Sequence, residues 1–182
     1  MSLAHAILVS LEECPQSGYD LAKKFDGSVG FFWKATHQQI YRELTKLEEL
    51  AWLIPQTIAQ VGRPDKKLYS LTDLGRENLK IWIAQPCEVS PNKEELLVKI
   101  YAGHLISPKI LEKEISRHQQ LHQETLAIYQ EIERQMHCGS QCLPETLKYT
   151  YLTLRIGIKF EIAWIEWCEE AIAAIGEKID FN

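Results

Sequence analysis

Apolar residues recur at helical spacing along most of the chain. In "MSLAHAILVSL" they return every three or four positions, which predicts an amphipathic helix that ends before Pro15. The segment "SGYDLAKKF" predicts a second, short helix, which Ser17 caps and which runs to about Phe25. Gly27 and Gly30 then interrupt the pattern. The chain is therefore expected to begin with two helices.

The clearest helix of the N-terminal half lies in "THQQIYRELTKLEELAWL". Thr36 is a suitable N-cap, and an apolar stripe that is expected to be buried follows it. The stripe consists of Ile40, Leu44, Leu47 and Ala51. The opposite face carries Gln38, Arg42, Thr45 and Glu49, with Tyr41 on one flank and Gln39 and Lys46 on the other. This helix therefore combines a buried face with an exposed polar face.

A β-hairpin is predicted next. The segment "WLIPQTIAQ" is typical of a strand, "KKLYSL" of its partner, and "VGRPD" of the turn between them. Pro55 suits an edge strand, and a two-stranded ribbon has an edge on both sides. Thr72 is expected to cap a fourth helix, "DLGRENLKIWIAQ", which stops before Pro86.

The segment "PCEVSPNKEE" carries two prolines among polar residues, and we place a domain boundary there. One domain is expected over residues 1–85 and a second over residues 93–182. The second domain is predicted to be helical, with one helix over residues 93–105 and a long one from Ser107-Pro108 to about Met136. The long helix has a seam of coiled-coil spacing made by Leu111, Ile115, His118, His122, Thr125, Tyr129, Ile132 and Met136.

The last segment alternates apolar and polar residues in "YLTLRIGIKFEI", but no turn signal separates it from the helical "AWIEWCEEAIAAI". We therefore predict one long helix over about residues 144–176. One apolar stripe contains Ile156, Phe160, Ala163, Trp167, Ala171 and Ala174, and the other contains Leu154, Ile158, Ile162, Ile165 and Ile172. A helix that is apolar on two sides needs two partners. One is expected to be the preceding long helix and the other the same helix of a second subunit.

The protein is therefore expected to be a homodimer held together by its C-terminal helices. The residues expected at the dimer interface are Ile156, Phe160, Ala163, Trp164, Trp167 and Ala171.

Charge is distributed unevenly between the halves. Residues 1–84 contain ten Lys/Arg and ten Asp/Glu, whereas residues 85–182 contain ten and fifteen, which accounts for the whole net charge of −5. A polyanionic partner is therefore expected to meet the first half. No apolar stretch is long enough for a membrane span, and "MSLAHAILVSL" lacks the basic start and cleavage site of a signal peptide, so a cytoplasmic location is expected.

The predicted order of helix, helix, helix, two-stranded hairpin and helix is that of a winged helix-turn-helix. The expected fold is mainly α: an N-terminal winged helix-turn-helix with a two-stranded β-wing, followed by a helical C-terminal dimerisation domain. In this architecture the third helix enters the major groove of DNA and the hairpin flanks it over the phosphate backbone. Cations in the hairpin then have a role, and Arg63, Lys66 and Lys67 are expected at its tip as phosphate contacts.

The third helix offers residue types that base recognition uses. Gln38, Gln39 and Arg42 lie in its first two turns, and Gln and Arg bind adenine and guanine edges in bidentate fashion. The helix N-terminus at Thr36 favours a phosphate. The hydroxyl of Tyr41 and the ammonium of Lys46 are expected on phosphates as well.

These segments carry a family resemblance. "SGYDLAKKF", "IYRELTKLEELAWL" and above all "GRPDKKLYSLTDLGRENL" resemble the PadR family of bacterial transcriptional regulators over residues 1–84, and the helical second half resembles the C-terminal region of its longer members. The resemblance implies that Tyr19, Tyr41 and the wing cations touch DNA and that the C-terminal half dimerises. This sequence has Arg42 where the family often has proline, so the family's operator sequences do not carry over.

The resulting hypothesis is a sequence-specific DNA-binding regulator, a repressor that acts as a homodimer on an inverted-repeat operator, with an effector left open. The alternative is a winged-helix module for protein interaction that has lost DNA binding. No phosphate loop, HExxH or nucleophile elbow is present, so neither an enzyme nor a cofactor is expected.

Three other groups of residues have alternative interpretations. His118 and His122 have a spacing that suits a metal, but without a carboxylate at a fitting position we favour a polar break in the helical seam. Cys138 and Cys142 are either a redox pair or two free thiols, and free thiols are favoured.

Phe160, Trp164 and Trp167 are the third group. They line either a ligand pocket or an ordinary core, and core packing is favoured.

Overall fold

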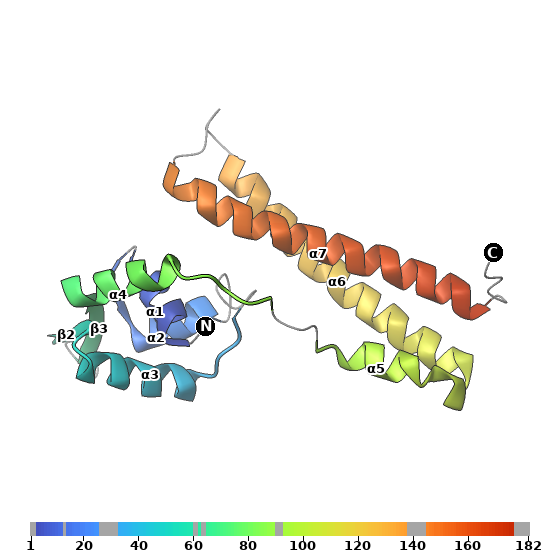
Figure 1. Cartoon of the computed structure of the whole chain (residues 1–182), viewed down its shortest axis with the longest axis horizontal. Helices are drawn as coiled ribbons and strands as arrows, with labels where there is room; N and C mark the ends of the chain where they lie inside the picture. The colour runs from blue at the N-terminus through green and yellow to red at the C-terminus, as the bar shows by residue number, and fades with distance from the viewer. Residues whose placement is uncertain are drawn as a thin grey trace. The chain divides into compact units, whose positions relative to one another are not determined.

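The computed structural model describes residues 3–12, 14–25, 33–59, 62, 65–89, 93–137 and 145–176. The chain divides into two compact units, Met1–Ser90 and Pro91–Asn182, and each is described by itself (Figure 1).

The N-terminal unit contains four helices and three strands among its described residues. They are α1 (Leu3–Glu12), β1 (Gln16–Ser17), α2 (Gly18–Phe25), α3 (His37–Glu49), β2 (Leu53–Ile58), β3 (Lys66–Leu71) and α4 (Asp73–Ile83). The predicted order of three helices, a hairpin and a fourth helix is confirmed. The predicted caps are confirmed too, since the hydroxyls of Ser17, Thr36 and Thr72 each accept a hydrogen bond from a backbone N–H of the helix that follows.

The sheet is antiparallel, with strand order β1-β3-β2. The prediction of a two-stranded ribbon missed β1, whose Gln16 lies opposite Tyr69. Two residues are too few to show strand alternation, and Gln16 is fixed by tertiary contact, because its Nε2 donates to the carbonyl oxygen of Ser10 at 2.7 Å. Pro55 lies on β2 at the edge of the sheet, as predicted.

The core of this unit lies between α1, α2, α3 and the sheet. Ile40, Leu44 and Leu47 of α3 are buried, which confirms the predicted stripe up to its last member. Ala51 is the exception: it is exposed and adopts a positive φ of 55° in the turn after α3. The helix ends at Glu49, two residues before Ala51, so Ala51 does not continue the buried stripe.

The start of α4 is fitted tightly to the turn after α3. The hydroxyl of Thr72 accepts from the backbone N–H of Gly75 at 3.0 Å, and the backbone N–H of Thr72 donates to the carbonyl oxygen of Trp52 at 3.0 Å. A Cβ atom at Gly75 would lie 2.2 Å from that same oxygen. The position therefore requires glycine because α4 approaches the backbone of Trp52 so closely.

All secondary-structure elements of the C-terminal unit are helices in its described residues. It contains α5 (Glu95–Tyr101), a 3₁₀ helix η2 (Gly103–Leu105), α6 (Pro108–His137) and α7 (Glu145–Gly176). The single helix predicted over residues 93–105 is wrong in its second part, which turns towards α6. A Cβ atom at Gly103 would lie 2.5 Å from a methyl carbon of Leu111, so the chain passes close to α6 there. The prediction of one long final helix is confirmed.

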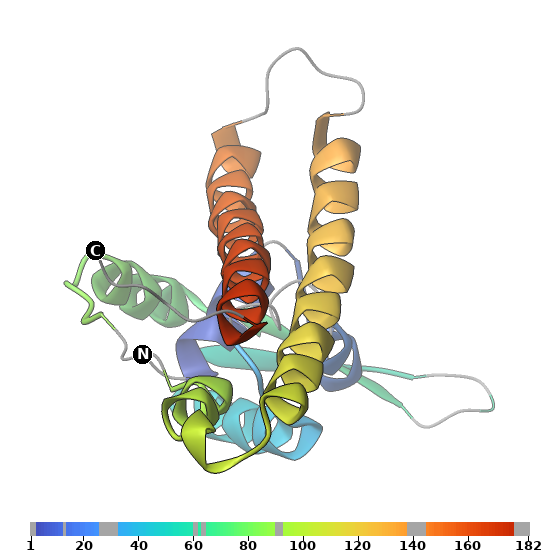
Figure 2. The ribbon, with the colours of Figure 1, turned by 90° about the vertical axis from the view of Figure 1, so that its right-hand side faces the viewer.

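The helices α6 and α7 lie side by side over most of their length (Figures 1 and 2). Every residue of the predicted α6 seam is buried or half-buried. Of the second apolar stripe of α7, Ile158 is buried and Leu154, Ile165 and Ile172 are half-buried. Leu96, Ile115, Trp164 and Cys168 form the centre of this unit's core. One of the two partners that α7 needs is therefore α6 of the same chain.

Within the described part of the chain, no helix is both long and apolar enough to cross a membrane.

Candidate nucleic-acid interface

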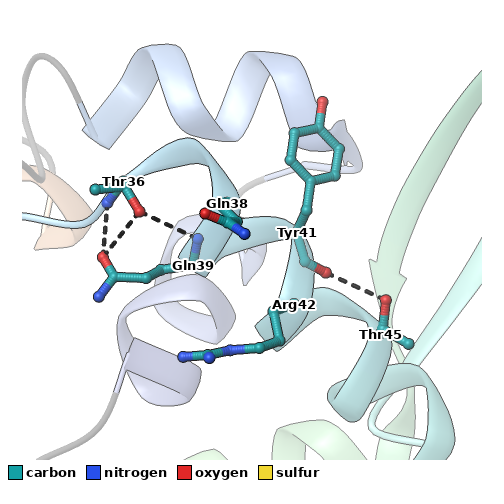
Figure 3. Close-up of a pocket in the computed structure, with 6 residues that line it drawn as sticks. All are labelled: Thr36, Gln38, Gln39, Tyr41, Arg42 and Thr45. Atoms are coloured by element: carbon teal, nitrogen blue, oxygen red, sulfur yellow. Dashed lines mark hydrogen bonds between the residues drawn. The ribbon is translucent and has the colours of Figure 1, made fainter.

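The polar face of α3 is exposed beside its N-terminus. Six side chains line an open surface hollow there: Thr36, Gln38, Gln39, Tyr41, Arg42 and Thr45 (Figure 3). All six are exposed, whereas Ile40 and Leu44 on the other side of the helix are in the core. Packing of the apolar stripe thus determines which face of α3 points outward.

A capping box closes the N-terminus of α3. The hydroxyl of Thr36 accepts from the backbone N–H of Gln39 at 3.3 Å, and Oε1 of Gln39 accepts from the backbone N–H of Thr36 at 2.8 Å (Figure 3). A bidentate contact to adenine needs both the oxygen and the amide nitrogen of a glutamine. Gln39 therefore has to leave the capping box before it can read a base in that way.

Gln38 and Arg42 are better placed to meet a ligand. Gln38 projects from the first turn of α3, and Arg42 extends along the hollow (Figure 3). Among the described residues, the guanidinium of Arg42 has no ion-pair partner. Lys46, by contrast, lies 3.3 Å from Oε2 of Glu43.

The start of α2 lies against the same face. A Cβ atom at Gly18 would lie 2.5 Å from the ring of Tyr41, so α2 begins directly beside that ring. Tyr19, the next residue, is 61% exposed. The two tyrosines thus come from neighbouring positions on consecutive helices.

The sequence placed both wing lysines at the tip of the hairpin, whereas the structure places them within its paired strands. Lys66 and Lys67 are the first residues of β3, opposite Ile58 and Thr57 of β2. Arg63 lies outside the described residues.

Each wing lysine is ion-paired within the chain. Lys66 Nζ lies 2.9 Å from Oδ2 of Asp20, and Lys67 Nζ lies 2.8 Å from Oε2 of Glu48. The hydrogen bond from Lys66 lowers the pKa of the Asp20 carboxyl, and the hydrogen bond to Glu48 raises the pKa of the Lys67 ammonium. Sequence reasoning missed both carboxylates, since nothing in the spacing links them to the lysines.

The residues predicted at a dimer interface fall into two groups. Ile156, Phe160 and Ala163 lie on the exposed side of α7, with Ile156 64% and Phe160 52% exposed. Trp164 is buried in its own chain, and Trp167 and Ala171 pack partly against the same core. An apolar face of α7 thus stays uncovered, but Trp164 is not on it.

The histidines of the α6 seam have acidic neighbours. Nδ1 of His122 lies 2.5 Å from Oε2 of the buried Glu161, and Nε2 of His118 lies 3.5 Å from Glu114. The expectation that no carboxylate lies nearby was therefore wrong, since α7 brings Glu161 to His122 across the helix pair. The described residues nonetheless contain no cluster of three or more His, Cys, Asp or Glu side chains that suits a metal. Cys138 and Cys142 lie outside the described residues.

The predicted aromatic group is packed against itself and His122. The ring of His122 stacks on Trp164 with centroids 5.0 Å apart, and Trp164 contacts both Phe160 and Trp167 edge-on. Trp164 is buried and Trp167 packs partly against the same core, as the favoured interpretation expects, whereas Phe160 is 52% exposed.

Three helices followed by a β-wing, with the polar face of the third helix exposed, define a winged helix-turn-helix DNA-binding protein. Two family models match the chain: "Transcriptional regulator PadR-like family" over residues 7–81 and "Virulence activator alpha C-term" over residues 92–176. A probable transcriptional regulator of Mycobacterium tuberculosis is 38% identical, over 98% of this chain and 100% of the relative. The chain therefore belongs to the PadR-like family of transcriptional regulators, which are not enzymes.

Two relatives with solved structures add detail. The negative transcriptional regulator PadR of Bacillus subtilis is 28% identical over 95% of this chain and 97% of PadR. Its complex with operator DNA matches with a TM-score of 0.82 at 29% identity, covering 95% of this chain and 98% of that one. Its complex with p-coumaric acid has a TM-score of 0.78 at 27% identity, covering 96% and 99%. The virulence activator AphA of Vibrio cholerae matches with a TM-score of 0.76 at 32% identity, covering 96% and 98%.

Proposed function

We propose that this regulator is a homodimeric repressor that binds an inverted-repeat operator and reads its bases with α3. The observation that carries the proposal is the exposed face of α3, where Gln38 and Arg42 project beside a capped helix N-terminus. Such a face offers hydrogen-bonding groups to base edges and a positive helix end to phosphate. The complex of Bacillus subtilis PadR with operator DNA supports the proposal by likeness.

Dimerisation is proposed through the uncovered face of α7. Large apolar side chains that remain exposed in one chain include Leu152, Ile156 and Phe160, which recur at helical spacing. Contiguous exposed apolar residues of this kind mark an interaction surface. A second copy of the same helix is the simplest partner, because a two-fold axis brings equal faces together and also generates the symmetry of an inverted repeat.

Repression and a response to an effector are proposed by likeness to PadR, which is a negative regulator and which was solved with p-coumaric acid. The aromatic group around Trp164 is filled by its own side chains, so an aromatic effector that used it would have to displace a ring. Titration of planar aromatic acids into the operator complex tests this part. Release of the operator that saturates as the acid concentration rises supports the effector proposal, and unchanged operator binding contradicts it.

Selection of bound duplexes from a random pool by the purified full-length protein tests the main proposal. The expected result is enrichment of an inverted repeat whose half-sites lie about one helical turn apart, about 34 Å. The alternative, a winged helix that binds only protein, predicts no enrichment and no salt-dependent shift of any duplex.

A further inference from the structure

Two carboxylates pair with the first two residues of β3, at the end of the wing ladder nearest the turn. Asp20 at the start of α2 pairs with Lys66, and Glu48 at the end of α3 pairs with Lys67. Because successive residues of a strand point to opposite faces, the two ion pairs lie on opposite faces of the hairpin. Both pairs join parts of the chain that are distant in sequence, unlike the local pair between Lys80 and Glu77 on α4.

The carboxylate of Asp20 is held in position by its own helix start. Its Oδ2 accepts a hydrogen bond from the Ser17 hydroxyl at 2.7 Å, and the Ser17 oxygen accepts from the backbone N–H of Asp20 at 3.2 Å. On the other face, the ammonium of Lys67 lies over the ring of Tyr69, 5.2 Å from its centroid. Neither lysine is therefore a free cation.

Both carboxylates lie on the helices that form the proposed DNA surface. Asp20 is two residues from Gly18, which touches the ring of Tyr41, and Glu48 belongs to α3 itself. A DNA phosphate that approaches the wing has to share a lysine with a carboxylate oxygen, or displace that carboxylate from the lysine. A lysine whose charge is already balanced within the protein also contributes less to counterion release.

We propose that Asp20 and Glu48 are intramolecular competitors for Lys66 and Lys67, and that they lower the affinity of this regulator for DNA phosphate whatever the base sequence. The inference rests on the proposed function. In this role the two carboxylates act through the lysines as positioning residues, and base discrimination stays with α3. The regulator thereby limits its retention on random DNA, because phosphate contacts carry no sequence information.

Fluorescence anisotropy of the full-length protein with a random duplex and with the selected operator, over a series of salt concentrations, tests the inference. The variants are Asp20→Asn and Glu48→Gln, which remove a charge and keep the shape of the side chain. Glu77→Gln is the matched control, since it removes the same charge from the pair with Lys80. Glu48→Asp keeps the charge, and thermal unfolding verifies that each variant is folded.

Each neutral variant is expected to bind both duplexes about two- to fivefold more tightly, the range that an exposed ion pair allows. The slope of log affinity against log salt is expected to steepen by up to about one unit. Glu77→Gln should leave affinity and slope unchanged, and Glu48→Asp should keep the slope of the unaltered protein. If Asp20→Asn disturbs the cap of α2, the affinity and salt slope of Glu48→Gln alone decide whether the inference holds.

A Lys67→Gln background separates competition from direct repulsion. The gain from Glu48→Gln should disappear there, because the carboxylate then has no lysine to occupy. An equal gain in that background would overturn the inference, as would unchanged affinity and slope in Glu48→Gln. An unaltered protein that shifts no duplex would overturn the proposed function, and the inference with it.

Discussion

Thr36 and Gln39 close the N-terminus of α3 with reciprocal hydrogen bonds, of 3.3 Å to the Thr36 hydroxyl and 2.8 Å to the Gln39 amide oxygen. The neighbouring Gln38 takes no part in this box and projects into the surface hollow. Two adjacent glutamines that look equivalent in the sequence therefore have different expected roles: one stabilises the helix start and the other meets DNA.

Replacement of each glutamine by alanine should separate these roles. Gln39→Ala should lower the free energy of unfolding by up to about 1 kcal/mol through loss of the capping box, and should change base preference little. Gln38→Ala should leave stability within about 0.5 kcal/mol. It should reduce discrimination between operator and altered operator by about 1–3 kcal/mol. Chemical denaturation and competition binding measure the two effects. The reverse pattern would show that the capping box opens on DNA.

Gly75→Ala should destabilise the N-terminal unit by about 1–3 kcal/mol, because the added Cβ would meet the carbonyl oxygen of Trp52 and force α4 away. Gly176→Ala is the control, since a Cβ there meets nothing within 4 Å. Thermal unfolding of both variants measures the difference. Equal midpoints would mean that α4 adjusts without cost.

Ile156→Asp should weaken the proposed dimer more than about tenfold, because a carboxylate would replace an apolar side chain at the centre of the interface. The monomer should stay folded, since Ile156 is 64% exposed in one chain. Gln123→Asp, an exposed change on α6, is the control. Sedimentation at several concentrations measures the dissociation. A well-behaved monomer of the unaltered protein at micromolar concentration would remove the basis for this prediction.

Glu114 should titrate far below an ordinary glutamate. Hydrogen bonds from Arg117 lower its pKa from 4.5 to about 2, so this pair contributes stability above pH about 4.5 and loses that contribution as the pH falls towards about 2. In Arg117→Met the pKa of Glu114 should rise towards 4.5. Carboxyl NMR titration of both proteins measures the shift. An unchanged pKa in the variant would show that the contact with Arg117 is not formed in solution.

Periodic features of the sequence were sufficient to predict the helices that bury an apolar stripe. The stripe from Ile40 to Leu47 and the seam from Leu111 to Met136 both lie where their spacing placed them. The long α7 could be predicted because no turn signal interrupts it, although a part of it alternates like a strand.

Features that depend on tertiary contact could not be predicted. β1 has only two residues, so its strand character comes from pairing with β3 rather than from its own pattern. The partners of Lys66, Lys67 and His122 come from other elements, and spacing along one helix or strand carries no information about them. The face of α3 followed from its stripe, and the spacing of Thr36 and Gln39 is that of a capping box, a local signal that was open to prediction but was not used.

Arg42→Ala tests the central claim most directly, that α3 reads bases. Arg42 projects from the second turn of α3 and has no ion-pair partner among the described residues, so its loss should remove a base contact without disturbing the fold. Affinities of the unaltered and variant proteins for the selected operator and for a random duplex are measured at one salt concentration. We expect the operator affinity to fall by about 1–3 kcal/mol more than the random-duplex affinity. Equal loss on both duplexes would make Arg42 a backbone contact and contradict the account.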